Sequence, residues 1–175
     1  YNGETGELIY KLDGITYCIV DEEAIAIDCE SSVTNATVPS TVNGYPVVEL
    51  RETFKGNTNL KTVTLSEGLK KISASAFASS GITAVSIPNS VTSVGSSAFS
   101  GCASLTSIKF SDNMTEITND MFHSCSKLSA VSIPGNIKKI GSYAFFNCDA
   151  LKEITISSGV TYIGDRAFDS CDSYT

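Results

Sequence analysis

Four cysteines recur at a constant interval in the second half of the chain. They are Cys102, Cys125, Cys148 and Cys171, and the spacing between successive members is the same throughout. Thiolates bind zinc, but a structural zinc site needs four ligands that converge on a tetrahedron, and the sequence contains no C-x-x-C motif. A ladder with one cysteine per repeat does not converge in that way. We therefore expect a row of buried thiols that pack as small apolar groups.

Disulfide bonds are the alternative chemistry for the cysteines. Stacked strands lie ~4.8 Å apart and bridged Cα atoms are usually ~4.4–6.8 Å apart, so bonds between adjacent repeats are geometrically conceivable. A bridge between Cys18 and Cys29, which precede the repeats, is a second option. Thiol packing is the favoured interpretation of the ladder, and the pairing of Cys18 with Cys29 stays open.

Few other side chains could act in catalysis or bind a metal. His123 is the only histidine, and no repeated position places a serine, cysteine or aspartate beside it. Asp21, Glu22 and Glu23 form the densest acidic cluster, and the sequence favours a solvated hairpin tip there over a weak cation site. The sequence therefore predicts a chain that is not an enzyme, with no catalytic residue, no metal site and no cofactor.

The charge of the chain is uneven. Residues 1–52 carry ten acidic and two basic side chains, whereas residues 53–175 carry nine acidic and ten basic ones. The repeats have no lysine or arginine stripe, which argues against a nucleic acid partner, because neutralising phosphates supplies non-specific affinity. No apolar run approaches the roughly 18 to 20 residues that span a bilayer, so this segment is predicted not to insert into a membrane.

The elements that carry these side chains are predicted by an internal repeat. Phenylalanine recurs at Phe54, Phe77, Phe99, Phe122, Phe145 and Phe168, in equal steps except that the one from Phe77 to Phe99 is shorter by a single position. Five units follow, starting at Leu60, Ile82, Leu105, Leu128 and Leu151, with one loop residue missing between Phe77 and Ile82. They share the template L-x-x-V-x-I-P-x-x-V-x-x-I-G-x-x-A-F-x-x-C-x-x. A fixed period of about 23 residues is typical of a solenoid.

Each repeated position has a physical reason. The segment L-x-x-V-x-I alternates apolar and polar residues, as a half-buried strand does, and successive units are expected to stack these strands as a parallel sheet. A second apolar pair, spaced by three residues and often followed by glycine, predicts a short extended or 3₁₀ piece and a tight bend. The Ala-Phe pair is expected to place a ring between turns, so that stability comes from contacts between neighbouring units.

The two ends of the chain differ from the repeats. Residues 8–29 contain β-prone runs around the polar tip at residues 21–23, which predicts a hairpin that caps the first turn. We assign residues 1–58 to this acidic cap and an atypical first repeat, and residues 59–175 to the five regular units. Tyr174 falls where a further unit would begin, so additional repeats, another domain or a partner are expected to follow.

The repeat resembles the BspA-type leucine-rich-repeat family, also called the Treponema pallidum type. The resemblance rests on residues 85–91 (VSIPNSV), residues 94–99 (VGSSAF) and Gly101-Cys102, and residues 38–47 (VPSTVNGYPV) resemble the capping unit of such proteins. It implies a leucine-rich-repeat solenoid from a host-associated bacterium, secreted or displayed on the cell surface, that adheres to host or neighbouring-cell components. Ser73 and Thr118 depart from the family by replacing the usual glycine, and residues 50–54 form a shortened bend.

A binding surface is the function that the residues favour. Outward positions of the predicted sheet are small and polar, with no aromatic anchor of the kind that dominates tight interfaces. Three aromatic residues that the template does not require, Tyr143, Phe146 and Tyr162, are candidate contact residues, with simple packing at the rim as the alternative. We expect a non-catalytic module that binds a protein or glycan ligand, such as host extracellular matrix. The alternative is a structural spacer that carries another domain beyond residue 175.

Overall fold

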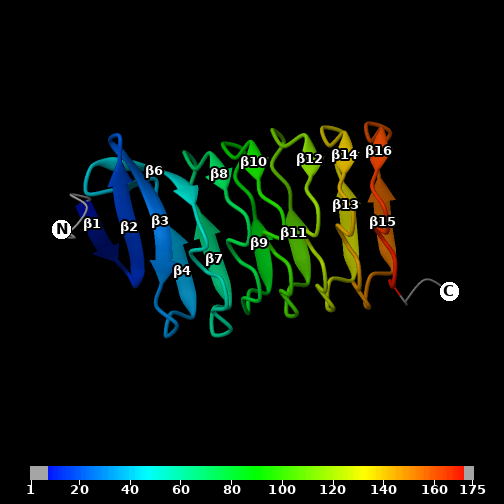
Figure 1. The fold of residues 1–175 in the computed structure, drawn as a ribbon, viewed down its shortest axis with the longest axis horizontal. Coiled ribbons are helices and arrows are strands. Elements are labelled where there is room, and N and C mark those ends of the chain that lie inside the picture. The colour runs from blue at the N-terminus through cyan, green and yellow to red at the C-terminus, as the bar shows by residue number, and fades with distance from the viewer. Residues whose placement is uncertain (1–7, 172–175) are drawn as a thin grey trace.

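The structure is a computed structural model that describes residues 8–171. It is an elongated solenoid in which the turns of the chain stack along one axis, from an N-terminal hairpin to the last repeat (Figure 1). The strands are β1 (Leu8–Leu12), β2 (Ile15–Val20), β3 (Glu23–Cys29), β4 (Asn35–Val38), β5 (Thr41–Val42), β6 (Tyr45–Leu50), β7 (Thr62–Leu65), β8 (Lys71–Ile72), β9 (Ala84–Ser86), β10 (Ser93–Val94), β11 (Ser107–Lys109), β12 (Glu116–Ile117), β13 (Ala130–Ile133), β14 (Lys139–Ile140), β15 (Glu153–Ile156) and β16 (Tyr162–Ile163). Tyr174 lies outside the described residues.

Each regular unit contributes two strands, and this confirms the predicted parallel stacking. The longer strand carries the L-x-x-V-x-I pattern, and β13 pairs in parallel with β15 so that Ala130 lies beside Glu153, one repeat later. The shorter strand carries the second apolar pair, and β14 pairs in parallel with β12 and β16. Because equivalent positions align from turn to turn, each template position becomes a column that runs along the solenoid axis.

The ladder of longer strands is interrupted twice. Hydrogen-bonded pairs form between β4 and β7, between β9 and β11, and between β13 and β15. Within residues 8–171, β7 does not pair with β9, and β11 does not pair with β13. The first interruption follows the one unit that is a residue shorter than the others, whereas the second lies beside Phe110, whose ring is larger than the aliphatic side chains of its column.

A column of phenylalanine rings forms the centre of the core. Phe54, Phe77, Phe99, Phe122 and Phe145 are each 0% exposed. Neighbouring rings stack with centroids 5.0–5.5 Å apart, and Phe168 continues the stack at 5.2 Å from Phe145. Offset stacking at this distance is a favourable arrangement for aromatic rings, in addition to the free energy gained by removing them from water.

The segments around this column are turns, which corrects one expectation. No helix of any kind occurs among the residues that the structure describes, so the second apolar pair is the extended alternative, a two-residue strand, and the predicted 3₁₀ or helical pieces are wrong. In the five regular units, the turn is instead closed by left-handed residues two positions before and two positions after the phenylalanine. Ser75, Ser97, Asp120, Tyr143 and Arg166 form the first column, with φ between 50° and 59°.

The N-terminal segment caps the solenoid as predicted. Strands β1, β2 and β3 form an antiparallel meander, and β3 then pairs in parallel with β6 of the first turn. The register places Cys18 opposite Ile25 and Cys29 opposite Ile15. At about 3.3 Å per residue, the two cysteines are therefore more than 10 Å apart along the hairpin, which excludes the bridge left open between them.

The shortened bend of the capping unit is also confirmed. The Thr53 hydroxyl donates to the carbonyl oxygens of Ala26, at 2.7 Å, and of Arg51, at 2.9 Å. A buried threonine thus ties this bend to the hairpin cap, and Phe54 still enters the phenylalanine column.

Candidate functional site

The cysteine column packs as thiols. Each sulfur donates to the carbonyl oxygen of the phenylalanine in the preceding turn, and the four distances range from 3.0 to 3.3 Å. Cys102, Cys125 and Cys148 are free thiols with 0% exposure, so no disulfide links them between turns. Burial raises the pKa of the Cys102 thiol to about 11 and that of Cys148 to about 12. These sulfurs remain protonated at neutral pH and are poor nucleophiles and metal ligands.

The column continues towards the N-terminus with polar side chains. Ser80 and Asn57 take the cysteine position in earlier turns, and the Ser80 oxygen lies 3.5 Å from the sulfur of Cys102. Asn57 is 4% exposed, and its amide nitrogen donates to the carbonyl oxygens of Glu30 and Val33. Its amide oxygen accepts from the backbone of Asn59 and Leu60. The column therefore satisfies buried backbone groups, which is a structural role.

The acidic cluster at the hairpin tip is divided by the fold. Asp21 and Glu22 are exposed on the turn between β2 and β3, with φ of 51° and 63°. Glu23 instead forms an ion pair with Lys70 of the solenoid, at 2.8 Å. Among residues 8–171, no group of three histidine, cysteine, aspartate or glutamate side chains is arranged to hold a metal ion.

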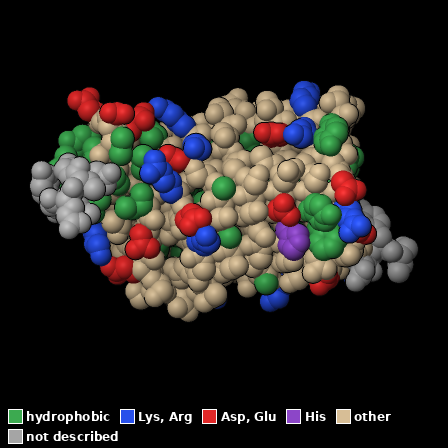
Figure 2. Space-filling view, viewed as in Figure 1, with side chains coloured by type: hydrophobic (Ala, Val, Ile, Leu, Met, Phe, Trp, Pro, Cys, Tyr) green, Lys and Arg blue, Asp and Glu red, His purple; other side chains and the backbone are tan. Residues whose placement is uncertain are grey.

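Two of the three candidate aromatic residues lie together. The rings of Tyr143 and Phe146 meet edge to face with centroids 5.4 Å apart, and the ring of His123 stacks on Phe146 at 5.2 Å. All three side chains are partly exposed, and Figure 2 shows the histidine beside a hydrophobic group, with acidic and basic side chains next to them. We call His123, Tyr143 and Phe146 the aromatic cluster. Tyr162 makes no ring contact with it among the described residues and lies against Lys139, whose Nζ is 5.8 Å from the ring centroid.

The repeat explains why the cluster forms. His123 and Phe146 directly follow Phe122 and Phe145, so they occupy the same column in adjacent turns. Tyr143 lies three residues before Phe146, and a turn with a 3.2 Å bond from the Phe146 N–H to the Tyr143 carbonyl brings the two rings together. From the sequence alone, His123 is considered only for catalysis. Its position one full repeat before Phe146 was the signal that could have added it to the contact residues.

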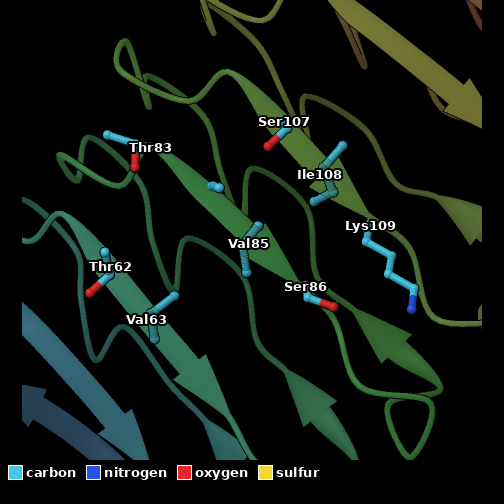
Figure 3. A pocket seen from close by; sticks show the side chains of 9 residues that line it. Thr62, Val63, Thr83, Val85, Ser86, Ser107, Ile108 and Lys109 are labelled. Carbon is cyan, nitrogen blue, oxygen red and sulfur yellow. The ribbon is translucent and has the colours of Figure 1, made fainter.

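The outer face of the longer strands is small and polar, as expected. Its outward positions are all exposed: Thr62, Thr64, Ala84, Ser86, Ser107, Lys109, Ala130, Ser132, Glu153 and Thr155. The face is hollowed beside β7, β9 and β11, where a depression of about 430 Å³ opens between the strands (Figure 3). The aromatic cluster and this hollow are both surface features that a ligand could contact.

Three solved structures illustrate the similarity to known proteins. A leucine-rich-repeat protein of T. pallidum is 25% identical, with a TM-score of 0.64 over 94% of this chain and 68% of its own. A leucine-rich-repeat protein of Bacteroides capillosus is 27% identical, with a TM-score of 0.57 over 86% of this chain and 99% of its own. The pneumococcal vaccine antigen PcpA is 19% identical, with a TM-score of 0.60 over 87% of this chain. The aligned region covers 50% of the PcpA chain.

A comparison of the sequence with curated proteins finds no significant match. The family comparison is decisive, because residues 50–175 match the model of the BspA type leucine-rich repeat region in six copies. This match covers most of the chain and includes every unit of the repeat. The chain therefore belongs to the BspA-type leucine-rich-repeat family.

Proposed function

We propose that this chain is a non-catalytic binding module of a secreted or cell-surface protein, and that it attaches a host-associated bacterium to protein or glycan components of host or neighbouring cells. The aromatic cluster is the observation that carries the proposal. Its column otherwise holds Lys55, Ala78, Ser100 and Asp169, so large rings are a local departure from the repeat. Tyrosine, with tryptophan and arginine, is among the residues enriched at binding hot spots.

The surroundings of the cluster support binding over catalysis. The Nδ1 atom of His123 lies 3.0 Å from the hydroxyl oxygen of Ser124, its neighbour in the chain. His123 and Ser124 are sequence neighbours in the same turn, so this is a local contact. The imidazole ring remains stacked on Phe146. A nucleophile-base pair also needs a third group that orients the base, and no hydrogen bond to His123 from such a group occurs within residues 8–171.

The solved relatives support the proposed location at the cell surface. One solved relative comes from T. pallidum, and another is the pneumococcal protein PcpA. PcpA is a vaccine antigen, which fits a protein that is displayed to a host. No helix among residues 8–171 is long and apolar enough to cross a membrane.

The proposal is tested with panels of immobilised extracellular-matrix proteins and glycans. The wild-type chain is expected to bind at least one ligand, and the variant with alanine at His123, Tyr143 and Phe146 should lose most of this binding while keeping its melting temperature within a few degrees. The variant Tyr162→Ala, which changes an exposed ring outside the cluster, is the matched control and should bind normally. No ligand in either panel, or equal binding by the cluster variant, would contradict the proposal.

A structural spacer is the second candidate function. It is favoured by the continuous stack of rings from Phe54 to Phe168, which makes each turn rigid with respect to its neighbours. A spacer needs length and stiffness but no particular surface. Replacing this segment in the full-length protein with an unrelated solenoid of equal length would preserve function if the spacer proposal is correct, and would abolish attachment if the module itself binds.

A further inference from the structure

The ladder of shorter strands is interrupted between β10 and β12. Strand β10 ends the sheet that runs from the cap, and β12 begins a separate sheet with β14 and β16. In the other regular units, the residue after the shorter strand donates its N–H to the preceding turn, as Gly141 does to Ile117 at 2.7 Å. Thr118 takes this position in the unit of residues 105–127, and its N–H makes no such bond among residues 8–171.

A second bond is missing on the same side of this unit. The residue before the shorter strand normally donates to the preceding turn, from Thr92 to Lys70 at 3.1 Å and from Lys138 to Thr115 at 2.8 Å. In the part of the chain that the structure describes, the Thr115 N–H does not donate to Thr92. The two turns therefore stand apart on this side, and a gap of about 170 Å³ opens there, lined by Ser96, Glu116, Thr118, Asn119 and Lys139.

The side chain of Thr118 explains this separation. Gly95, Gly141 and Gly164 occupy the same column in other units, and a Cβ atom on any of them would collide with the backbone of the preceding turn. Thr118 carries a branched side chain, so its turn cannot approach Ser96 as closely as those glycines approach their neighbours. The Thr118 hydroxyl is buried and has no hydrogen-bond partner among the described residues. It therefore spaces the two turns without joining them.

The next step along the solenoid opens on the other ladder. Strand β11 does not pair with β13, and within residues 8–171 the Ser129 N–H does not donate to Thr106. All other regular units make the equivalent bond, as Lys152 does to Ser129 at 2.9 Å. Phe110 directly follows β11 where other units have leucine or isoleucine, and its ring packs edge to face on Phe122 at 5.9 Å. The larger ring accounts for the wider spacing on this side.

The unit of residues 105–127 thus joins two separate halves of the strand ladders. Its longer strand, β11, pairs with β9 of the preceding unit, whereas its shorter strand, β12, pairs with β14 of the following unit. Met121 enlarges the unit further, because it is 0% exposed at a position where the other regular units have alanine. Side chains that exceed the space of a repeat force the backbone to shift, and here the shift separates the ladders.

The turn side of the solenoid stays closed at both steps. The Phe99 N–H donates to the Met121 carbonyl at 3.0 Å, and the Phe122 N–H donates to the Ala144 carbonyl at 2.8 Å. The rings of Phe99 and Phe122 remain stacked, but their centroids are 5.5 Å apart, compared with 5.0–5.2 Å elsewhere in the column. Turns that are bonded on one side and open on another have the geometry of a hinge.

We infer that the unit of residues 105–127 is a flexible joint at which the solenoid bends about its turn side. The hollow beside β7, β9 and β11 lies on one half of the ladders, and Tyr143 and Phe146 lie in a turn of the other half. Bending changes the angle between these two surfaces, so that one chain fits ligands of different shape. The inference goes beyond the proposed function, because it holds for any ligand, and it weighs against the stiff spacer.

Residual dipolar couplings of the isotope-labelled 175-residue chain test the joint in solution. In a rigid rod, the amides of residues 34–94 and of residues 128–163 share one alignment tensor. A joint that bends partly averages the couplings of the shorter segment, so residues 128–163 should require a smaller alignment magnitude than residues 34–94. A single tensor that fits both segments equally well would overturn the inference.

Hydrogen exchange measures the opening between β10 and β12 one amide at a time. The amides of Thr115 and Thr118 should exchange at least about tenfold faster than those of Lys138 and Gly141, their bonded equivalents in the next unit. Equal protection at the two pairs would show that the turns are closed in solution, contrary to the joint.

The variant Thr118→Gly should close this opening. Without the spacing side chain, the amide at position 118 should become as protected as that of Gly141. Ser73→Gly is the matched control, because Ser73 also stands in the glycine column but its N–H already donates to Leu50 at 2.8 Å. Both variants gain the same backbone freedom of glycine in the unfolded state, so only the closure distinguishes them. Unchanged exchange at position 118 in a folded Thr118→Gly chain would contradict the inference.

A double variant tests both steps together. Phe110→Ile restores the usual aliphatic side chain, so in combination with Thr118→Gly it should close both ladders and slow the exchange of the Ser129 amide. The two segments should then share one alignment tensor. A folded double variant that keeps the wild-type difference in alignment magnitude would show that these side chains do not create the joint, and the inference would fail.

Discussion

The imidazole ring of His123 lies against the ring of Phe146, with centroids 5.2 Å apart and planes inclined by 21°. The contact joins two adjacent turns through one surface column, outside the buried stack of phenylalanines. Tyr143 closes the group from the same turn as Phe146, although its φ of 57° is unusual for a bulky side chain. The repeat imposes this φ, since every unit has a left-handed residue at that position.

The stacking of His123 on Phe146 should be measurable as a coupling free energy. In a double-mutant cycle with His123→Ala and Phe146→Ala, we expect about 0.5–1 kcal/mol of coupling in urea unfolding, the lower part of the range for aromatic pairs because both rings are partly exposed. His123→Ala with Tyr162→Ala is the control cycle and should be additive. A coupling of zero in the first cycle would show that the rings do not stabilise each other in solution.

The buried thiols should make the chain less stable in alkaline solution. Their folded pKa values are raised, to about 11 for Cys102 and about 12 for Cys148, so above pH 9 the unfolded chain releases protons that the folded chain retains. Their contribution is complete below pH 9 and is lost as the pH rises towards these values. The urea concentration at the unfolding midpoint should therefore be lower at pH 10 than at pH 8. The difference should be smaller for Cys148→Ala.

The same thiols should resist modification in the folded chain. Iodoacetamide at pH 8 should alkylate Cys102, Cys125 and Cys148 only at the rate of unfolding, since each is 0% exposed and its pKa is raised by burial. Peptide mapping by mass spectrometry checks this against the urea-unfolded chain, in which all cysteines should react within minutes. Rapid labelling of Cys125 without unfolding would contradict the buried column.

The buried tyrosine of the cap should be replaceable by phenylalanine. Tyr17 is 0% exposed and its hydroxyl has no hydrogen-bond partner among the described residues. A buried polar group without a partner costs on the order of 1–3 kcal/mol, so Tyr17→Phe should leave the free energy of unfolding unchanged or raise it by about 1 kcal/mol. Tyr10→Phe, on the partly exposed ring beside Tyr45, is the control. A clear loss of stability in Tyr17→Phe would reveal a partner, such as an internal water molecule.

Most of the fold could be predicted because the repeat constrains each position many times. The parallel stacking, the ring column, the hairpin cap and the buried cysteines each followed from alternation or from a fixed spacing. The sequence left an extended piece and a 3₁₀ piece open, because a spacing of three between apolar residues fits both; the structure has the extended one, a two-residue strand followed by a turn, as at Lys139–Ile140. Only the backbone distinguishes these two, and here the turn adopts left-handed φ at residues that are not glycine.

The candidate site was predicted less completely. Tyr143 and Phe146 were selected because the template did not require them, and the fold brings them together. Tyr162 met the same criterion but lies in a strand column beside Lys139, so an off-template aromatic residue does not by itself belong to a cluster. The interruption between β7 and β9 could not be foreseen, because a missing loop residue indicates a local change but not which hydrogen bonds are lost.

The glycine of the repeat should be required by close packing between turns. A Cβ atom on Gly141 would collide with the backbone nitrogen and side chain of Asn119 in the preceding turn. Gly141→Ala should therefore push two turns apart and lower the free energy of unfolding by about 1–3 kcal/mol, the usual cost of overpacking. Gly135→Ala is the matched control in the same unit, because its nearest neighbour would be the Ser157 side chain at 3.9 Å, an ordinary contact. Urea unfolding compares the two variants, and equal stabilities would mean that the turns separate without cost, contrary to a solenoid whose stability comes from contacts between neighbouring units.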